Sequence, residues 1–227
     1  MAQRYGIVTL GLLVAAAAWA QESTVDKRFR DASAVFQEIM NISDRSIPQD
    51  LLERAECIVI IPGLKKGAFV VGGKYGRGFA SCRHGETWGS PSAERIEGGS
   101  FGFQIGGSST DVILLVMNQR GMDRIASDKF TIGAEGSAAA GPVGRTASAN
   151  TDVMMTAEIL SWSRSRGAFA GLSLEGATLR PDDDENELLY GKAIKSKEIL
   201  TNPETKVPDR ARGFIATLQK YAPHHKG

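Results

Sequence analysis

The sequence predicts an α+β fold: a single domain with a curled, mainly antiparallel, glycine-rich β-sheet, flanked by N- and C-terminal amphipathic helices. Three observations support this prediction. Residues 112–117 form an uninterrupted apolar run of strand length, rich in β-branched residues, which is typical of a strand buried on both faces. Of the 26 glycines, 21 lie between residues 63 and 176, where short apolar segments alternate with glycine turns. The clearest helical spacing of apolar residues lies near the two ends, over 26–40 and 208–221.

The first predicted helix, over 26–40, carries Phe29, Phe36 and Ile39 on its apolar face and basic residues near its start. Such a face fits either a protein core or a membrane surface, and we expect it to contribute apolar area at a membrane. Further along the chain we expect helices over 48–55, 119–126 and 182–190, a strand over 57–61 that ends at Pro62-Gly63, strands over 68–71, 78–83, 87–88 and 130–140, and a hairpin joining 153–162 to 168–174.

The N-terminus has the pattern of a secretory signal peptide. Arg4 precedes an apolar stretch, and Ala18-Trp19-Ala20 is an A-x-A cleavage site, so we expect residues 1–20 to be removed and the protein to be secreted or periplasmic. We expect a domain over 21–200, followed by the C-terminal amphipathic helix and tail over 201–227. Cys57 and Cys82 would then meet an oxidising compartment, and the sequence leaves open whether they pair.

The net charge of the chain restricts the kinds of binding partner that we expect. Removing Arg4 with the signal peptide lowers Lys+Arg from 27 to 26, equal to the 26 Asp+Glu, so no broad nucleic-acid surface is expected. An anionic partner would need a local basic patch. If the predicted turns meet at one end of the sheet, six basic residues would form a patch able to hold phosphate groups: Lys65, Lys66, Lys74, Arg77, Arg164 and Arg166.

Enzyme chemistry has little support. Residues 98–102 match the G-x-S-x-G nucleophile elbow around Ser100, and the order Ser100, Asp152, His224 would suit a serine esterase. The elbow requires a helix after the serine, whereas a strand-like segment follows. The glycine-rich segments lack nucleotide-binding spacing, and two cysteines without a nearby histidine do not make a zinc site. We therefore expect no catalytic residues, cofactor or metal.

Several segments together resemble the SYLF-domain family, the lipid- and actin-binding domains of eukaryotic endocytic proteins and their secreted bacterial relatives. The resemblance covers roughly residues 30–195 and is clearest in IPQDLLERA at 47–55, KGAFVVGGKYGRG at 66–78 and SWSRSRGAFAGLSLEG at 161–176. It implies a non-enzymatic module that binds acidic phospholipids, phosphoinositides in the eukaryotic members, with actin bundling in some of them.

The leading hypothesis is therefore peripheral binding to an anionic phospholipid membrane through the basic patch and the amphipathic helix. The alternative is a structural or protein-interaction module of the cell envelope, with an envelope protein as its partner. Actin binding is expected only if the protein meets a eukaryotic host, and the Ser100 esterase is a minor alternative.

Overall fold

A computed structural model describes most of the chain: residues 24–42, 46–69, 71–101, 106–133, 138–141, 157–165, 168–169, 174 and 176–224. The predicted signal peptide, Asp152 and Arg166 lie outside these residues. No helix in the described part of the chain is long and apolar enough to cross a membrane.

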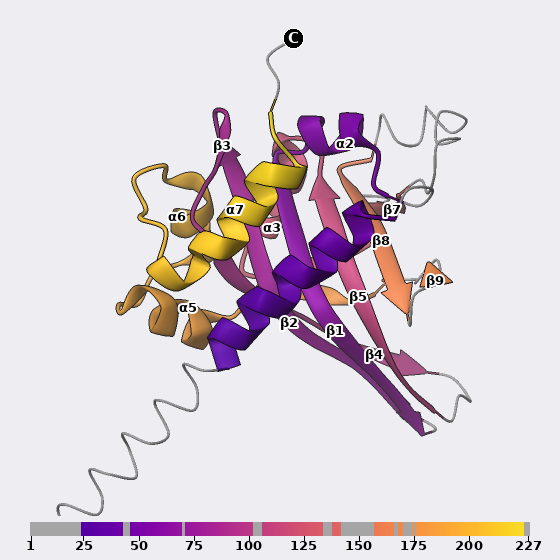
Figure 1. The fold of residues 1–227 in the computed structure, drawn as a ribbon. Helices are drawn as coiled ribbons and strands as arrows, with labels where there is room; N and C mark the ends of the chain where they lie inside the picture. The colour runs from indigo at the N-terminus through magenta and orange to yellow at the C-terminus, as the bar shows by residue number, and fades with distance from the viewer. Residues whose placement is uncertain are drawn as a thin grey trace, which may run out of the picture.

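The described strands form a curled sheet with helices at both the N- and C-terminal ends of the domain, as predicted (Figure 1). Eight strands follow one another in the order β6-β10-β4-β2-β1-β5-β8-β7, while β3 pairs with β2 and β9 with β8. The β7–β8 pair is parallel and the other described pairs are antiparallel. The strands are β1 (Cys57–Phe69), β2 (Val71–His84), β3 (Thr87–Trp88), β4 (Ser92–Phe101), β5 (Gly106–Val116), β6 (Phe130–Thr131), β7 (Ala138–Ala140), β8 (Ile159–Ser165), β9 (Ala168–Phe169) and β10 (Thr178–Pro181).

The helices agree with the predicted spacing at most positions. The N-terminal helix covers residues 24–40 in the described part of the chain. The predicted helices over 48–55, 119–126, 182–190 and 208–221 are confirmed, and a short helix that was not predicted follows the third of them. The bounds are α2 (Gln49–Arg54), α3 (Gln119–Ile125), α5 (Asp183–Tyr190), the additional α6 (Ser196–Thr201), and α7 (Arg212–Tyr221) after the 3₁₀ turn η3 (Asp209–Ala211).

Both faces of the central strands are buried, which explains their uninterrupted apolar sequences. Successive side chains of a strand point to opposite faces. In β5, Ile113 and Leu115 join the core beneath the N-terminal helix and α7, whereas Val112, Leu114 and Val116 join a second core on the other face. The prediction that this segment is a strand buried on both faces is confirmed.

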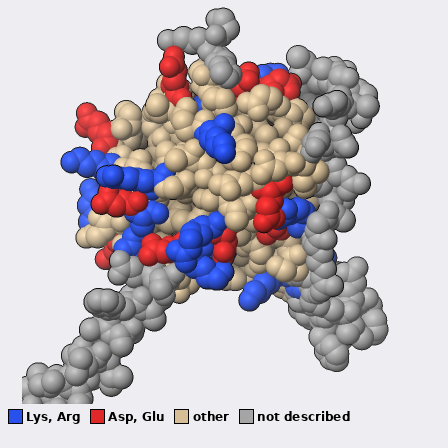
Figure 2. Space-filling model, in the orientation of Figure 1, with Lys and Arg blue, Asp and Glu red and all other residues tan. Residues whose placement is uncertain are grey.

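The N-terminal helix crosses the sheet and buries the face that we expected to meet a membrane. Phe29, Phe36 and Ile39 are 3%, 0% and 0% exposed. Phe29 stacks on Phe79 of β2 with 3.7 Å between ring centroids, and it also contacts Phe214 of α7. The prediction of a membrane-facing Phe29, Phe36 and Ile39 is therefore wrong for this structure, because the sheet offers the same helix face an apolar surface to cover. Figure 2 shows that the outer surface on this side carries charges of both signs.

The first strand does not stop at Pro62-Gly63 as predicted. It continues to Phe69 through a bulge, where the register with β5 shifts between Ile61 and Leu64. Gly63 takes a positive φ of 59° there, and its N–H donates to Asp111 Oδ1 at 2.9 Å. A bulge bends its strand and increases the local twist. Lys65 and Lys66 consequently lie in a strand and not in a turn.

The glycines of β2 allow β1 to approach closely at this bend. A Cβ on Gly78 would lie 1.9 Å from the carbonyl oxygen of Ile60. A Cβ on Gly76 would lie 2.8 Å from side-chain atoms of Ile61 and Leu64. With these glycines, β2 runs unbroken from Val71 to His84 and is longer than the predicted strand over 78–83.

A second predicted strand divides into two. Phe130–Thr131 forms β6 and Ala138–Ala140 forms β7, and these strands lie at opposite ends of the strand order. The sequence predicted a single strand because small residues continue the apolar pattern across the segment. Tertiary contacts decide which strand each part pairs with: β6 pairs with β10, and β7 pairs with β8.

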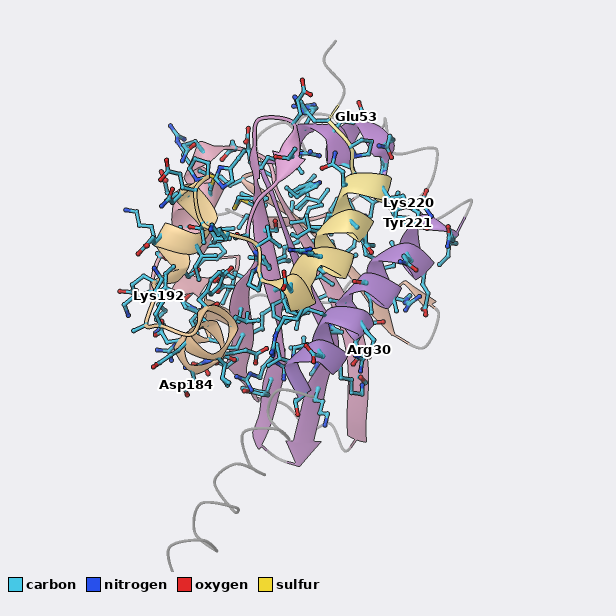
Figure 3. All side chains as sticks on the ribbon, turned by 60° about the vertical axis from the view of Figure 1, so that its left-hand side comes forward. Arg30, Glu53, Asp184, Lys192, Lys220 and Tyr221 are labelled. Carbon is cyan, nitrogen blue, oxygen red and sulfur yellow. A yellow bond between two sulfur atoms is a disulfide. The ribbon has the colours of Figure 1, made fainter. Side chains whose placement is uncertain are left out.

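The end of the sheet near α2 is held by a disulfide and by an arginine. Cys57 and Cys82 form the disulfide, directly opposite each other in β1 and β2. Arg83 lies over the ring of Trp88 and donates to carbonyl oxygens at the ends of α2 and α7, those of Ala55 and Ala222. Burial lowers the pKa of Arg83 to about 10. Figure 3 shows Tyr221 and Lys220 at this end of α7, next to the N-terminal helix.

Candidate functional site

Three of the six predicted basic residues lie together on the β1–β2 hairpin, beyond the bulge. Lys66 is directly opposite Lys74, and Lys65 is directly opposite Tyr75. Directly opposed residues of antiparallel strands have Cβ atoms about 5 Å apart, and like charges in such a pair are destabilising by up to about 1 kcal/mol. Burial and the neighbouring Lys66 ammonium both lower the pKa of Lys74, which is only 9% exposed. We refer to Lys65, Lys66 and Lys74 as the lysine cluster.

The lysine cluster occupies both faces of the hairpin. Along β2, Tyr75 and Arg77 share the face of Phe79, which is covered by helices, and Lys74 shares the opposite face with Ala80. Lys65 therefore lies on the helix side with Tyr75, and Lys66 lies on the other side with Lys74. Lys65 is exposed, and the structure gives it no ion pair among the described residues. The cluster thus presents positive charge on two sides of one hairpin.

A groove of about 340 Å³ lies beside Lys65, between the start of the N-terminal helix and the two strands. Lys27 and Tyr75 line it together with Lys65. Tyr75 is 49% exposed, and Lys27 forms a 2.6 Å ion pair with Asp31 at the surface. A surface pair of this kind contributes little stability and can exchange partners. The basic residues at this helix start are evident from the sequence, but Tyr75 is not, because its position beside Lys65 depends on the bulge.

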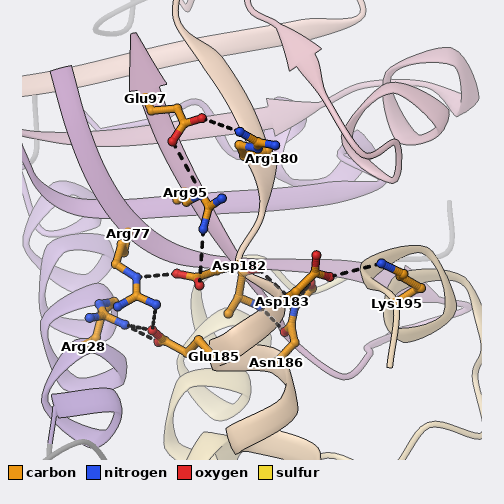
Figure 4. Close-up of polar contacts among 12 residues, drawn as sticks. Arg28, Arg77, Arg95, Glu97, Arg180, Asp182, Asp183, Glu185, Asn186 and Lys195 are labelled. Carbon is orange, nitrogen blue, oxygen red and sulfur yellow. Dashed lines mark hydrogen bonds and ion pairs between the residues drawn. The ribbon is translucent and has the colours of Figure 1, made fainter. Parts of the chain in front are cut away.

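Arg77 belongs to an internal ion-pair network and not to the lysine cluster (Figure 4). Its guanidinium bonds Asp182 and lies 2.9 Å from Glu185. These two carboxylates are 2% and 3% exposed, and Arg28 of the N-terminal helix also bonds Glu185. Burial alone would lower the pKa of Arg77, but the hydrogen bond to Asp182 and the two carboxylate charges together raise it. Arg77 therefore joins α5 to the sheet, and we no longer assign it to headgroup binding.

Arg164 also forms ion pairs with carboxylates of the protein. It lies opposite Asp111 in β5, two residues from the strand partner of Lys65, so it does share the correct end of the sheet. Its guanidinium donates to Asp111 at 2.9 Å and to Glu38 of the N-terminal helix at 2.6 Å. Burial opposes the charge of Arg164, but these bonds raise its pKa. The patch of six predicted from the sequence thus contains three clustered lysines, two ion-paired arginines and Arg166, which lies outside the described residues.

Ser100 does not have the surroundings of a nucleophile elbow. It lies inside β4, directly opposite Gly72 of β2, and the next described element is another strand. The elbow requires a strand-to-helix turn at the serine. His224 has its Nδ1 3.2 Å from the carbonyl oxygen of Glu53. The esterase alternative therefore lacks its structural requirement.

Comparison with known families gives a match over residues 97–221 to the Ysc84 family, described as "Las17-binding protein actin regulator". These residues make up more than half of the chain.

Named relatives come from animals and fungi. The chain is 31% identical over 186 residues to SH3 domain-containing YSC84-like protein 1 of Xenopus laevis, covering 78% of this chain and 55% of that protein. It is 32% identical over 184 residues to Protein YSC84 of Saccharomyces cerevisiae, covering 79% and 39%. It is 28% identical over 206 residues to the Homo sapiens YSC84-like protein 1, covering 88% and 60%. The chain thus spans about half the length of these relatives, and none of their names denotes an enzyme.

The family match, its extent and the fold agree with the resemblance seen in the sequence: the chain belongs to the Ysc84, or SYLF-domain, family.

Proposed function

We propose that the protein binds anionic phospholipids at a membrane surface, without catalysis, and that the lysine cluster is the headgroup site. The observation that supports this most strongly is the direct opposition of Lys66 and Lys74. Two opposed ammonium groups repel each other in the free protein, and an anion placed between or above them would reverse the sign of that interaction. A binding role also agrees with the description of the family.

The expected strength comes from several weak contacts. A lysine near an anionic membrane surface contributes about 1 kcal/mol, so three together would contribute about 3 kcal/mol, or roughly a hundredfold in affinity. Lys27 lies across the groove from Lys65 and could add to this if it leaves Asp31. The apolar face of the N-terminal helix contributes no area in this proposal, because the core occupies it.

We further propose that the protein acts outside the cytoplasm, as a secreted or periplasmic protein. The signal-peptide pattern of residues 1–20 supports this, and so does the Cys57–Cys82 disulfide, since disulfides persist in oxidising compartments. The phospholipid would then belong to a membrane facing that compartment.

Co-sedimentation with vesicles tests the proposal. Residues 21–227 are expected to sediment with vesicles containing phosphatidylglycerol but not with vesicles of phosphatidylcholine alone, and the bound fraction should fall steeply as salt is raised. Equal binding to both vesicle types, or no binding to either, would contradict the proposal. The description of the family as Las17-binding would then favour a protein partner, to be sought in an envelope extract.

A further inference from the structure

The part of the β1–β2 hairpin that carries the lysine cluster is more open on its helix side than on its other side. Figure 1 shows β1 and β2 continuing together past the N-terminal helix, so this helix covers only part of their length. On the helix side, Lys65 is exposed and Tyr75 is 49% exposed. On the other side, Lys66 is half-buried and Lys74 is only 9% exposed. A large partner therefore reaches the hairpin most easily from the helix side.

The sheet next to Tyr75 is open on the same side. Gly73 lies two residues from Tyr75 along β2, so the two positions share a face, and Gly99 of β4 is directly opposite Gly73. Both glycines are exposed, and a Cβ on Gly99 would have no atom within 4 Å. Space is therefore free above the sheet beside the tyrosine ring.

Tyr75 and Lys65 together have the chemistry of a membrane boundary. They are directly opposed in the two strands, so their Cβ atoms lie about 5 Å apart. Each side chain has an apolar body and a polar tip, which suits the boundary between lipid headgroups and acyl chains. Tyr75 is one of two exposed large hydrophobic side chains in the described structure, and the other is Leu188 of α5.

The charges around this face favour an anionic partner. No Asp or Glu occurs between residues 65 and 75. Two carboxylates border the face, and both have cationic partners: Asp31 pairs with Lys27, and Glu97 pairs with an arginine of β10. Lys65 has no such partner among the described residues, so its charge is available to an external anion. A second copy of the chain docking through the same face would oppose two Lys65 ammonium groups.

We infer that the protein docks on an anionic bilayer through the helix side of this hairpin, with Tyr75 entering the boundary between headgroups and acyl chains and Lys65 binding the phosphates. This inference rests on the proposed function and adds the docking face and an apolar contact. Tyr75 supplies the contact that the buried face of the N-terminal helix cannot. Lys66 and Lys74, on the other side of the same strands, attract the bilayer at longer range, over a Debye length of about 10 Å.

Tryptophan fluorescence with brominated lipids tests the docking face. A Tyr75→Trp variant of residues 21–227 is mixed with phosphatidylglycerol vesicles whose acyl chains carry bromine, a quencher that acts only at short range. Leu188→Trp is the matched control, because Leu188 is also a large hydrophobic residue at the surface, 37% exposed, but lies on α5. The native Trp88 and Trp162 are 3% and 2% exposed and provide a constant background.

We expect the tryptophan emission of the Tyr75→Trp variant to shift to shorter wavelength and to lose at least half its intensity above that background, with little change for the Leu188→Trp variant. A Tyr75→Ser variant should bind the same vesicles about tenfold more weakly, because it loses apolar burial. A Tyr75→Phe variant keeps the ring and should stay within about threefold of the parent. The far-UV circular dichroism spectra of these variants should equal that of the parent.

Two other outcomes separate the inference from the proposed function. If the vesicles sediment the protein but the Tyr75→Trp variant is quenched no more than the Leu188→Trp variant, docking through this face is wrong and lipid binding stands. If the parent protein does not sediment with the vesicles, the proposed function fails, and the inference fails with it.

Discussion

Replacing Arg77 with methionine is expected to lower the free energy of unfolding by about 3 kcal/mol, the effect of removing one partner from a buried ion pair. Asp182 and Glu185 would keep their positions at 2% and 3% exposure but would lose their shared guanidinium. Arg28 still bonds Glu185, whereas the ion pair left to Asp182 within the described part of the chain is the one with Arg95, at 3.9 Å. Urea denaturation at pH 7 measures the change.

Arg180→Met is the matched control. Arg180 forms a 2.7 Å pair with Glu97, but these side chains are 40% and 37% exposed, so its removal should cost less than about 1 kcal/mol. Vesicle binding by the folded fraction of Arg77→Met should equal that of the parent. Loss of vesicle binding at unchanged stability would instead return Arg77 to the lipid site.

Replacing Glu94 with glutamine is expected to remove a pH-dependent loss of stability. Glu94 is fully buried on β4, and its Oε1 accepts hydrogen bonds from Ser92 and Ser196 at 2.9 and 2.6 Å. Its Oε2 has no hydrogen-bond partner in the described structure. Burial, with a smaller contribution from Asp182 and Asp183, raises the pKa of Glu94 to about 7.

The direction in which Glu94 changes the free energy of unfolding with pH follows from proton binding in the native and unfolded states. Below about pH 4.5 the carboxyl is protonated in both the native and the unfolded state, so its ionisation has no effect on stability. Between about pH 4.5 and 7 the native state holds a proton that the unfolded state has released, so stability falls as pH rises. The full loss, about 3 kcal/mol, remains above pH 7. Glu94→Gln keeps the acceptor for the two serines and stays neutral throughout.

Urea denaturation of both proteins at several pH values between 4 and 8 checks this prediction. The difference between the two free energies of unfolding should grow in favour of the glutamine variant through this window, and taking the difference removes the effect of other titrating groups. Parallel curves would show that Glu94 ionises with an ordinary pKa in the native state.

The sequence predicted those parts of the fold that depend on local pattern. Helical spacing identified the N-terminal helix, α3, α5 and α7, and the apolar run at 112–117 identified a strand buried on both faces. It did not predict that β1 continues past Pro62-Gly63, because that continuation depends on a bulge held by Asp111, 48 residues away. Local composition carries no record of such a distant contact.

The absence of distant contacts from the local sequence also explains why only part of the candidate site was predicted correctly. Residue type and spacing suggested six cations at one end of a sheet, and Lys65, Lys66 and Lys74 do lie together. The sequence could not show that Arg77 and Arg164 have acidic partners at the start of α5 and on the N-terminal helix, since these partners are 105 and 126 residues away. An amphipathic helix likewise has the same pattern whether a sheet or a membrane covers its apolar face, and here the sheet covers it.

We propose that the lysine cluster, and not the overall charge, binds an anionic membrane. The most direct test compares two variants with the same change in net charge. Lys65→Glu/Lys66→Glu reverses two members of the cluster, and Lys192→Glu/Lys197→Glu reverses two exposed lysines at and just after the α5–α6 connection, where Figure 3 shows Lys192 away from the N-terminal helix.

Co-sedimentation with phosphatidylglycerol vesicles at low salt gives the apparent affinity of each variant. We expect the first variant to lose at least roughly a hundredfold in affinity and the second to stay within about threefold of the parent. Equal losses in the two variants would show that net charge alone drives binding. Undiminished binding by Lys65→Glu/Lys66→Glu would contradict the proposed site.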